Sequence, residues 1–217
     1  MRILLVDDHP MVRAGCRRTL EQAFNAEIIE AGNCREACRL AMDSAPDLVI
    51  LDLTLPGAGG LEALEMLRAQ NERLRVLVFS MHPNPVFAAR SIQSGARGYV
   101  VKCSPTDELL AGVREVLAGG IYLSRDLAKE IALAALCEDA DPLRELSSRE
   151  IEILRLLGRG NDLTNVASAL CISYKTVANS VTQIKAKLGV RHTGELVRLA
   201  IEQGLTDTIV GIKRSAS

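Results

Sequence analysis

The chain of 217 residues is long enough for two domains, since one domain typically takes roughly 100–200 residues. Apolar residues make up 48% and charged residues 24%, which excludes a disordered tail protein, a collagen-like fibre or a disulfide mini-protein. The apolar runs are shorter than the roughly 18–20 residues of a membrane span, and the N-terminus turns acidic at Asp7, unlike a signal peptide. We therefore expect a cytoplasmic protein without a membrane partner.

The formal net charge of −1 is unevenly distributed. Residues 1–142 carry 15 Lys or Arg against 20 Asp or Glu, whereas residues 143–217 carry 11 against 7. An acidic front and a mildly basic rear indicate different partners for the two parts. The six cysteines include no C-x-x-C pair. Zinc binding is the alternative, but in a reducing cytosol we interpret them as small apolar residues.

The first 120 residues alternate short apolar runs with amphipathic segments. Five short, mainly apolar runs that do not alternate with polar residues predict parallel strands buried on both faces: Ile3–Val6, Glu27–Ala31, Leu48–Leu51, Val76–Phe79 and Tyr99–Val101. The segments that follow them predict helices: Pro10–Phe24, Asn33–Asp43, Gly60–Gln70, Pro85–Ser94 and Pro105–Leu117. Five β-α units predict an α/β fold with a doubly wound, flavodoxin-like parallel sheet of five strands. Such a fold places its site beyond the carboxyl ends of the strands.

The remainder of the chain is predicted to be helical. Arg125–Leu136 is rich in Ala and Leu and predicts a helix, and the charged stretch after it ends at Pro142. We therefore divide the chain into a domain at 1–120, a partly helical linker at 121–142 and a small all-α domain at 143–217. Ser147 and Glu150 have the spacing of a capping box, and Ser173 and Thr193 are placed to cap two further helices.

Polar residues follow four strands of the predicted sheet. Asp7 and Asp8 come after the first strand and Asp52 after the third, while Ser80 and Lys102 close the fourth and the fifth. Each alone has an ordinary explanation, as a helix cap, a turn former or a surface charge. Because the carboxyl ends of parallel strands meet at one edge of the sheet, we expect all of them to converge on one site.

The residue types at this edge favour phosphoryl chemistry. Three clustered carboxylates repel one another unless a cation joins them, and oxygen ligands favour Mg²⁺. A lysine and a hydroxyl opposite the metal are placed to hold a phosphoryl group on the central carboxylate, Asp52. The sequence therefore predicts a magnesium-dependent phosphoacceptor site.

The motifs LVDDH at 5–9, DLVILDLTLPG at 47–57 and GYVVK at 98–102, together with Ser80, resemble the receiver domain of two-component response regulators. The resemblance covers residues 1–120. It implies that Asp52 accepts a phosphoryl group from a phospho-histidine on a sensor histidine kinase. Asp8, Asp52 and the backbone carbonyl of Thr54 would bind Mg²⁺ directly, and Asp7 would act through a water molecule.

The same resemblance implies a switch around the phosphoryl group. Lys102 would pair with the acyl phosphate, Ser80 would move to hydrogen-bond it, and Tyr99 would follow as the aromatic switch. The protein would then not be an enzyme, beyond intrinsic autophosphorylation and autodephosphorylation. The alternative is an aspartyl-phosphate hydrolase. Such enzymes have a second carboxylate two residues after the nucleophile, where this chain has Thr54, and a cap domain, for which this chain has no insertion.

A helix-turn-helix is expected in the rear domain. After Ser173, the apolar residues Val177, Val181, Ile184 and Leu188 share one helical face. The preceding helix ends at a tight turn at Cys171, as a helix-turn-helix requires, although any small helical bundle has similar stripes. The following residues are candidates for contact with DNA: Lys175, Thr176, Asn179, Thr182, Gln183 and Lys185.

The motifs LSSREIEIL at 146–154, KLGV at 187–190 and ELV at 195–197 resemble the LuxR-type helix-turn-helix over residues 143–206. A receiver followed by this module is the arrangement of the NarL/FixJ family, which implies a homodimer on double-stranded DNA with a two-fold symmetric site. Val197 and Ile201 on the last helix, Gly194–Gln203, are the candidates for the dimer contact. The alternative is that this helix is fully buried in its own domain.

The predicted function is a phosphorylation-switched DNA-binding transcription regulator. Before phosphorylation the receiver would cover the DNA-binding helices, and phosphorylation of Asp52 would release or pair them. The alternative is a receiver-controlled protein-interaction module with weakened DNA binding. It is favoured by Ala178, Thr182 and Thr164, which stand where members of the family often carry Lys or Arg.

Overall fold

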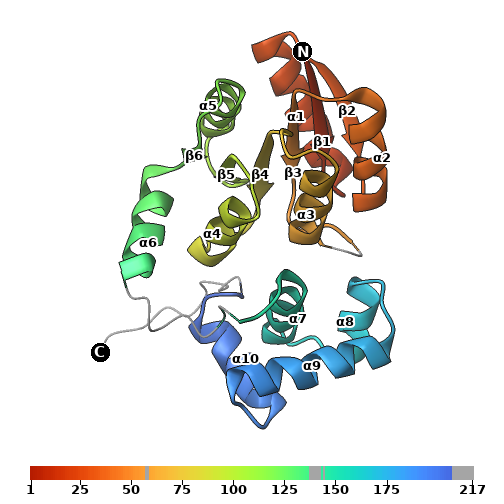
Figure 1. Cartoon of the computed structure of the whole chain (residues 1–217), viewed down its shortest axis with the longest axis vertical. Coiled ribbons are helices and arrows are strands. Elements are labelled where there is room, and N and C mark those ends of the chain that lie inside the picture. Colours follow the sequence, from red (N-terminus) through yellow and green to blue (C-terminus); the bar gives the residue numbers. More distant parts are fainter. Residues whose placement is uncertain (57–58, 137–142, 144, 207–217) are drawn as a thin grey trace, which may run out of the picture.

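The computed structural model describes residues 1–56, 59–136, 143 and 145–206. Alternating strands and helices come first, and a group of helices follows (Figure 1). The first part contains the elements β1 (Arg2–Val6), α1 (Pro10–Phe24), β2 (Glu27–Ala31), α2 (Cys34–Ser44), β3 (Leu48–Leu51), α3 (Gly60–Gln70), β4 (Val76–Ser80), α4 (Pro85–Gln93), β5 (Gly98–Val101), α5 (Thr106–Leu117), β6 (Tyr122–Leu123) and α6 (Arg125–Leu136). The second part contains α7 (Ser148–Gly158), α8 (Leu163–Ala169), α9 (Tyr174–Leu188) and α10 (Thr193–Glu202).

The sheet is parallel throughout and has the order β2-β1-β3-β4-β5-β6. The prediction of a doubly wound parallel sheet is confirmed, but the count of five strands is one too low. The sixth strand pairs Tyr122 with Gly98 and Leu123 with Tyr99. Two residues are too few to show a pattern of their own, so only their position beside β5 identifies them as a strand.

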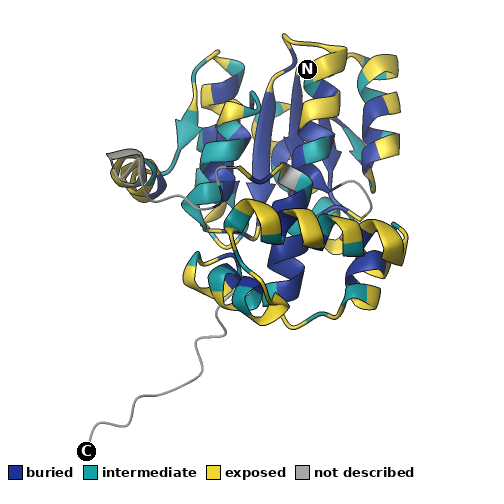
Figure 2. Ribbon diagram, turned by 60° about the horizontal axis from the view of Figure 1, so that its bottom comes forward, coloured by how far each residue is buried: buried dark blue, intermediate teal, exposed yellow. Residues whose placement is uncertain are grey.

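Apolar layers lie on both faces of the sheet. On one face, residues of β1, β3 and β4 pack with α1 and α5. On the other they pack with α2, α3 and α4, and the same apolar cluster includes residues of α6 and of the C-terminal helices. Every residue of β3 and β4 is buried, in agreement with their unbroken apolar sequences (Figure 2). Among the described residues, no helix is long and apolar enough to cross a membrane.

The helix ends test the predicted caps. Ser147 Oγ accepts the Glu150 N–H, and the Glu150 carboxylate accepts the Ser147 N–H at 2.7 Å, so the capping box is confirmed. Ser173 caps α9 as predicted. The cap at Thr193 is wrong, because His192 holds the extended conformation before α10 and Thr193 is already helical.

The cysteines fall into two groups. Cys16, Cys34 and Cys38 are buried among apolar residues, as the interpretation of small apolar residues requires. Cys103 and Cys171 are exposed, so burial does not explain them. Cys137 lies outside the described residues.

The capping box predicts a measurable loss of stability. We expect Ser147→Ala to lower the free energy of unfolding by about 1 kcal/mol, because the first turn of α7 loses its hydroxyl acceptor. Urea unfolding followed by circular dichroism measures this loss. Ser168→Ala, at an exposed position inside α8, is the control and should change stability by less than about 0.5 kcal/mol. An equal effect of the two substitutions would contradict the prediction.

Candidate functional site

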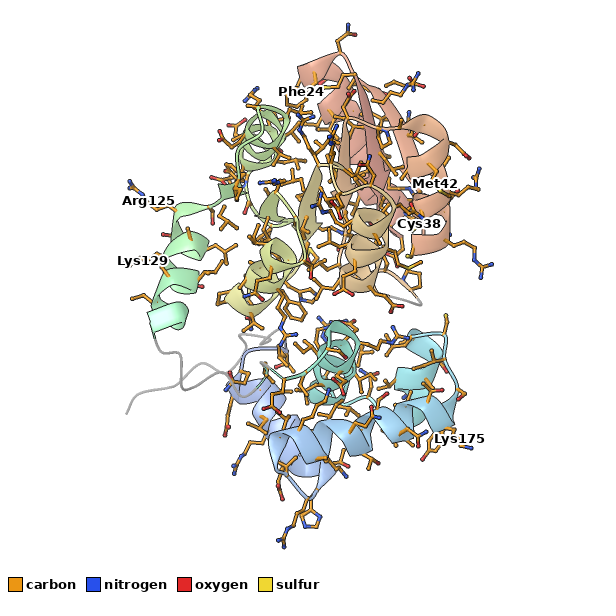
Figure 3. The ribbon with its side chains drawn as sticks, in the orientation of Figure 1. Phe24, Cys38, Met42, Arg125, Lys129 and Lys175 are labelled. Carbon is orange, nitrogen blue, oxygen red and sulfur yellow. The ribbon has the colours of Figure 1, made fainter. Side chains whose placement is uncertain are left out.

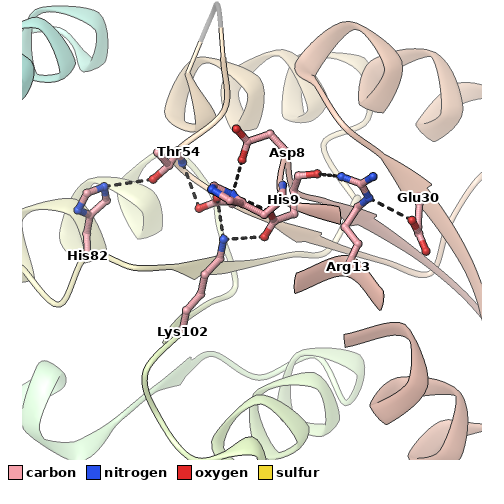
Figure 4. Close-up of polar contacts among 9 residues, drawn as sticks. Asp8, His9, Arg13, Glu30, Thr54, His82 and Lys102 are labelled. Carbon is pink, nitrogen blue, oxygen red and sulfur yellow. Dashed lines mark hydrogen bonds and ion pairs between the residues drawn. The ribbon is translucent and has the colours of Figure 1, made fainter. Parts of the chain in front are cut away.

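The carboxyl edge of the sheet brings three predicted residues into direct contact. Lys102 Nζ lies 2.6 Å from Asp7 Oδ2 and 2.7 Å from Asp52 Oδ2 (Figure 4). Their side chains are only 6%, 2% and 1% exposed. Asp7, Asp52 and Lys102 follow β1, β3 and β5, respectively, so the parallel strands position each of them at the same edge.

Local backbone hydrogen bonds fix the two buried carboxylates. Asp52 Oδ1 accepts the Thr54 N–H at 3.0 Å, and Asp7 Oδ1 accepts the His9 N–H at 2.8 Å. The first residue of α3, Gly60, donates its N–H to the Leu53 carbonyl at 2.9 Å. A Cβ atom at this glycine would lie 2.4 Å from the Asp52 carbonyl oxygen, so only glycine lets α3 begin this close to the site.

The charges of the site are strongly coupled. Burial raises the pKa of the Asp52 carboxyl, and the ammonium of Lys102 opposes this effect without cancelling it. Burial by itself would lower the pKa of Lys102, but its bonds to Asp52 and Asp7 outweigh burial and raise it. The lysine therefore stays protonated, as a fixed positive charge between two carboxylates.

The acidic cluster fits a divalent cation. Ligand atoms of Asp7, Asp8, His9 and Asp52 all lie within 4.8 Å of one another. Asp8 Oδ1 is buried and accepts no hydrogen bond within the described part of the chain, although His9 Nδ1 lies 2.6 Å away. Lys102 bonds two of these carboxylates, Asp7 and Asp52, and Asp8 adds a third negative charge, so the cluster retains an excess of negative charge that a hard cation with oxygen ligands would neutralise.

The predicted switch residues meet at a histidine that sequence reasoning missed. The buried Tyr99 hydroxyl donates to the His82 carbonyl at 2.7 Å, and the His82 N–H donates to Ser80 Oγ at 3.3 Å. The His82 ring stacks on Phe87 and places Nε2 3.3 Å from Thr54 Oγ1. The one sequence signal for His82 is its place directly between the end of β4 and the start of α4.

The helix α9 has the two faces that the sequence predicts. Val177, Val181 and Ile184 are buried, whereas the candidate DNA contacts lie on the outer side. Lys175, Thr176, Asn179, Thr182 and Gln183 are exposed, and Lys185 is partly exposed. Figure 3 shows Lys175 at the beginning of α9, on the side away from the sheet. The expectation that the receiver covers the DNA-binding helices is therefore wrong for α9.

The last helix packs on its own domain with one face only. Leu196 and Ala200 are buried, and α10 packs chiefly against α7. Val197 is partly buried and Ile201 is 55% exposed. The alternative of a fully buried helix is therefore wrong, and an apolar residue is available on its outer face.

Two family models match the two parts of the chain. Residues 3–114 match the response regulator receiver domain, and residues 144–200 match the bacterial regulatory proteins of the luxR family. The chain belongs to the NarL/FixJ family of response regulators. It is therefore a transcription regulator with a receiver and a LuxR-type DNA-binding domain.

Individual relatives match both parts over most of the chain. The chain is 41% identical over 209 residues to the transcriptional activator protein ExaE of Pseudomonas putida, covering 94% of this chain and 98% of that protein. It is 33% identical over 210 residues to the response regulator GacA of Pseudomonas aeruginosa, covering 95% and 98%. Among solved structures, it is similar to RcsB of Salmonella enterica serovar Typhimurium, bound to the promoter rprA in the presence of the phosphomimetic BeF3−. That similarity has a TM-score of 0.66 at 25% identity and covers 91% of this chain and 97% of the other. The hydrolase alternative finds no support among these relatives.

The charge bridge of the receiver predicts a large effect of one substitution. We expect Lys102→Gln to lower the free energy of unfolding by about 3 kcal/mol, because two buried carboxylates lose their counter-charge. Urea unfolding at neutral pH in the presence of EDTA measures the loss, and Lys129→Gln on the exposed side of α6 is the control. Adding Asp52→Asn to Lys102→Gln should restore part of the stability. A loss below about 1 kcal/mol would contradict a stabilising role of the bridge.

Proposed function

We propose that phosphorylation of Asp52 switches this transcription regulator. The observation that supports it best is the bond from Lys102 Nζ to Asp52 Oδ2 inside an acidic cluster. The partner is a sensor histidine kinase that carries a phospho-histidine. An Asp52 carboxylate oxygen attacks the phosphorus, the phosphorus–nitrogen bond breaks, and the imidazole leaves. Lys102 is placed to hold an oxygen of the resulting acyl phosphate.

The residues of the cluster suit Mg²⁺ as the cofactor. Asp8, Asp52 and the Thr54 carbonyl are the proposed direct ligands, and Asp7 acts through water. The ion supplies positive charge that offsets the charge of the incoming phosphoryl group. The convergence of the ligand atoms of Asp7, Asp8 and Asp52 within 4.8 Å of one another supports this assignment. Ser80 and Tyr99, already joined through His82, are the proposed switch residues.

The proposed output is binding of double-stranded DNA by α9. Lys175 and Lys185 supply positive charge, while Thr176, Asn179, Thr182 and Gln183 supply hydrogen-bonding groups on the same exposed side. RcsB, to which the chain is structurally similar, is bound to a promoter in its solved complex. Pairing through Val197 and Ile201 of α10 would place two copies of α9 on a two-fold symmetric site.

The proposed division of the chain is a receiver at 1–120, a linker at 121–142 and a DNA-binding domain at 143–217. β6 lies just after residue 120 and extends the receiver sheet, so the first residues of the proposed linker belong to that sheet. The second candidate function is a protein-interaction module. It is favoured by three neutral residues, Ala178 and Thr182 on α9 and Thr164 on α8. They leave these helices with few positive charges for contact with DNA.

The proposed switch predicts a phosphorylation-dependent DNA motif. We expect a small phosphodonor with Mg²⁺ to label the full chain at Asp52, and the labelled protein to enrich a two-fold symmetric motif from a random duplex library. Asp52→Asn should abolish both the label and the enrichment. Asp47→Asn, at the opposite end of β3, is the control and should retain both. Labelling at Asp52 without enriched DNA would favour the protein-interaction module, and Asp52→Asn with a full DNA response would overturn the switch.

The proposed DNA surface predicts the salt dependence of binding. We expect Lys175→Ala to weaken binding to all duplexes and to reduce the slope of log K against log salt by about 1, because one phosphate contact is lost. Fluorescence anisotropy at several salt concentrations measures the slope. Lys129→Ala on α6 is the matched control and should leave the slope unchanged. An unchanged slope for Lys175→Ala would place this lysine outside the DNA interface.

A further inference from the structure

One side chain joins the beginning of α4 to the end of α10. Asn84 Nδ2 donates to the Gln203 carbonyl at 2.9 Å and to the Gly204 carbonyl at 2.8 Å. Its Oδ1 simultaneously accepts the Val86 N–H at 2.8 Å and caps α4. Carbonyls at the C-terminal end of a helix lack partners within the helix and need them from elsewhere. The Asn84 amide therefore satisfies the ends of two helices that lie in different parts of the chain.

The local shape at Gly204 allows this close contact. Gly204 has a φ of +62°, in the left-handed region that favours glycine. A Cβ atom there would lie 3.1 Å from Asn84 Nδ2, closer than an ordinary contact. The end of α10 is therefore shaped to receive the Asn84 amide.

Arg90, within α4, binds the segment of the chain that precedes α7. Arg90 Nη1 donates to the Leu146 carbonyl at 2.6 Å, and Nη2 donates to the Leu143 carbonyl. Leu143 and Leu146 are buried, so these carbonyls stand at the edge of an apolar contact. Asn84 and Arg90 thus hold the C-terminal helices at two places from one helix of the receiver.

The contacts leave part of the boundary open. A cleft of about 800 Å³ lies between the receiver and the C-terminal helices, lined by residues including Glu62, Glu65, Ser94, Arg149 and Cys171. Buried apolar residues on both sides also belong to one cluster. The two parts therefore meet through an apolar contact, the polar contacts of α4 and a cleft with both polar and apolar lining.

The receiver contacts the C-terminal helices on the side formed by α7 and α10. Glu150, Ile151 and the residues 153–157 of α7 are all buried, which is more than one face of a surface helix. In Figure 1, α7 lies between the receiver and α9, and α9 lies on the far side. The receiver therefore acts on the helices that position α9 and leaves the outer side of α9 free.

A short segment, residues 80–84, connects these contacts of α4 to the phosphoacceptor edge of the sheet. Ser80 Oγ accepts the His82 N–H, the His82 carbonyl accepts the Tyr99 hydroxyl, and Asn84 follows two residues later. The His82 ring stacks on Phe87 of α4. A displacement of Ser80 toward a phosphoryl group on Asp52 would thus be transmitted directly to the beginning of α4.

We propose that Asn84 and Arg90 form a latch by which the receiver fixes the position of α10 without covering α9. Phosphorylation of Asp52 opens the latch by moving the segment from Ser80 to Asn84. This second statement rests on the proposed phosphorylation, whereas the latch itself does not. The latch regulates pairing of the DNA-binding domains through α10, not access of DNA to α9.

The Asn84→Asp variant separates the two roles of this side chain. Aspartate is as good an N-cap as asparagine, so α4 retains its cap. A carboxylate cannot donate to the two carbonyls of α10 and repels them. We expect the population of undocked domains to rise about tenfold, since the two lost hydrogen bonds together correspond to about one such factor. Arg90→Gln is the second variant. It replaces the guanidinium group of the other contact with a shorter, uncharged side chain.

Asn33→Asp is the matched control. Asn33 is also a side-chain N-cap, of α2, although its Oδ1 accepts the N–H of the third residue on, Glu36, at 3.0 Å. Its substitution by aspartate introduces the same charge away from the latch. The measurement is ¹⁵N relaxation of the full unphosphorylated chain, which yields a rotational correlation time for residues 1–120 and another for residues 145–206. Thermal unfolding confirms that each variant is folded.

We expect wild type and Asn33→Asp to show one common correlation time, and Asn84→Asp and Arg90→Gln to show a shorter time for residues 145–206. A common time in all four proteins, or separate times already in wild type, would overturn the latch. Adding a small phosphodonor and Mg²⁺ to wild type should shorten the time for residues 145–206. If this last step fails while both latch variants separate the domains, the latch stands and the proposed role of Asp52 is overturned.

Discussion

The ion bridge from Lys102 to Asp7 and Asp52 is the interaction on which the site depends. It joins the ends of β1, β3 and β5, which are separated by up to 95 positions in the chain. Buried carboxylates of like charge would not stay together without a counter-charge. Because lysine supplies one positive charge for three acidic residues, the edge of the sheet is held together but remains short of positive charge. A site of this kind is bridged by its own lysine and would still gain from a divalent cation.

The same constraint connects the receiver to the rest of the molecule. Asp52 is held by the Thr54 N–H, Thr54 Oγ1 lies beside the His82 ring, and the His82 backbone holds both Ser80 and Tyr99. These contacts join Asp52 to the backbone of His82. His82 stands in the segment between β4 and α4, so a change in charge at Asp52 acts on the segment that leads into α4. The fold therefore places the beginning of α4 directly after the segment that these contacts join to Asp52.

Much of the receiver could be predicted because its strands are buried on both faces. The continuous apolar runs at 48–51 and 76–79 favour strands of this kind, and parallel pairing brings Asp7, Asp52 and Lys102 to one edge. The sequence did not reveal β6, because Tyr122 and Leu123 show no period and are a strand only through pairing with β5. His82 was missed for a related reason. Its role lies in backbone groups and in a ring contact with Phe87, which residue type does not specify.

The packing of the receiver on the C-terminal helices is the least predictable feature, because of the kind of contact that holds it. The start of helix α7 was predicted from its capping box, but the sequence does not say that a second surface covers this helix. The polar contacts with that surface are made to backbone carbonyls, including those of Leu146, Gln203 and Gly204, which every residue type carries. Carbonyls at helix ends are unpaired by the geometry of the helix itself, so any helix end offers them to a suitable donor. An asparagine that already caps one helix is such a donor, because its oxygen and its amino group point to different partners. Contacts of this kind can form and break without exposing a buried charge, which suits a surface that must be released while the ion bridge of the receiver stays in place.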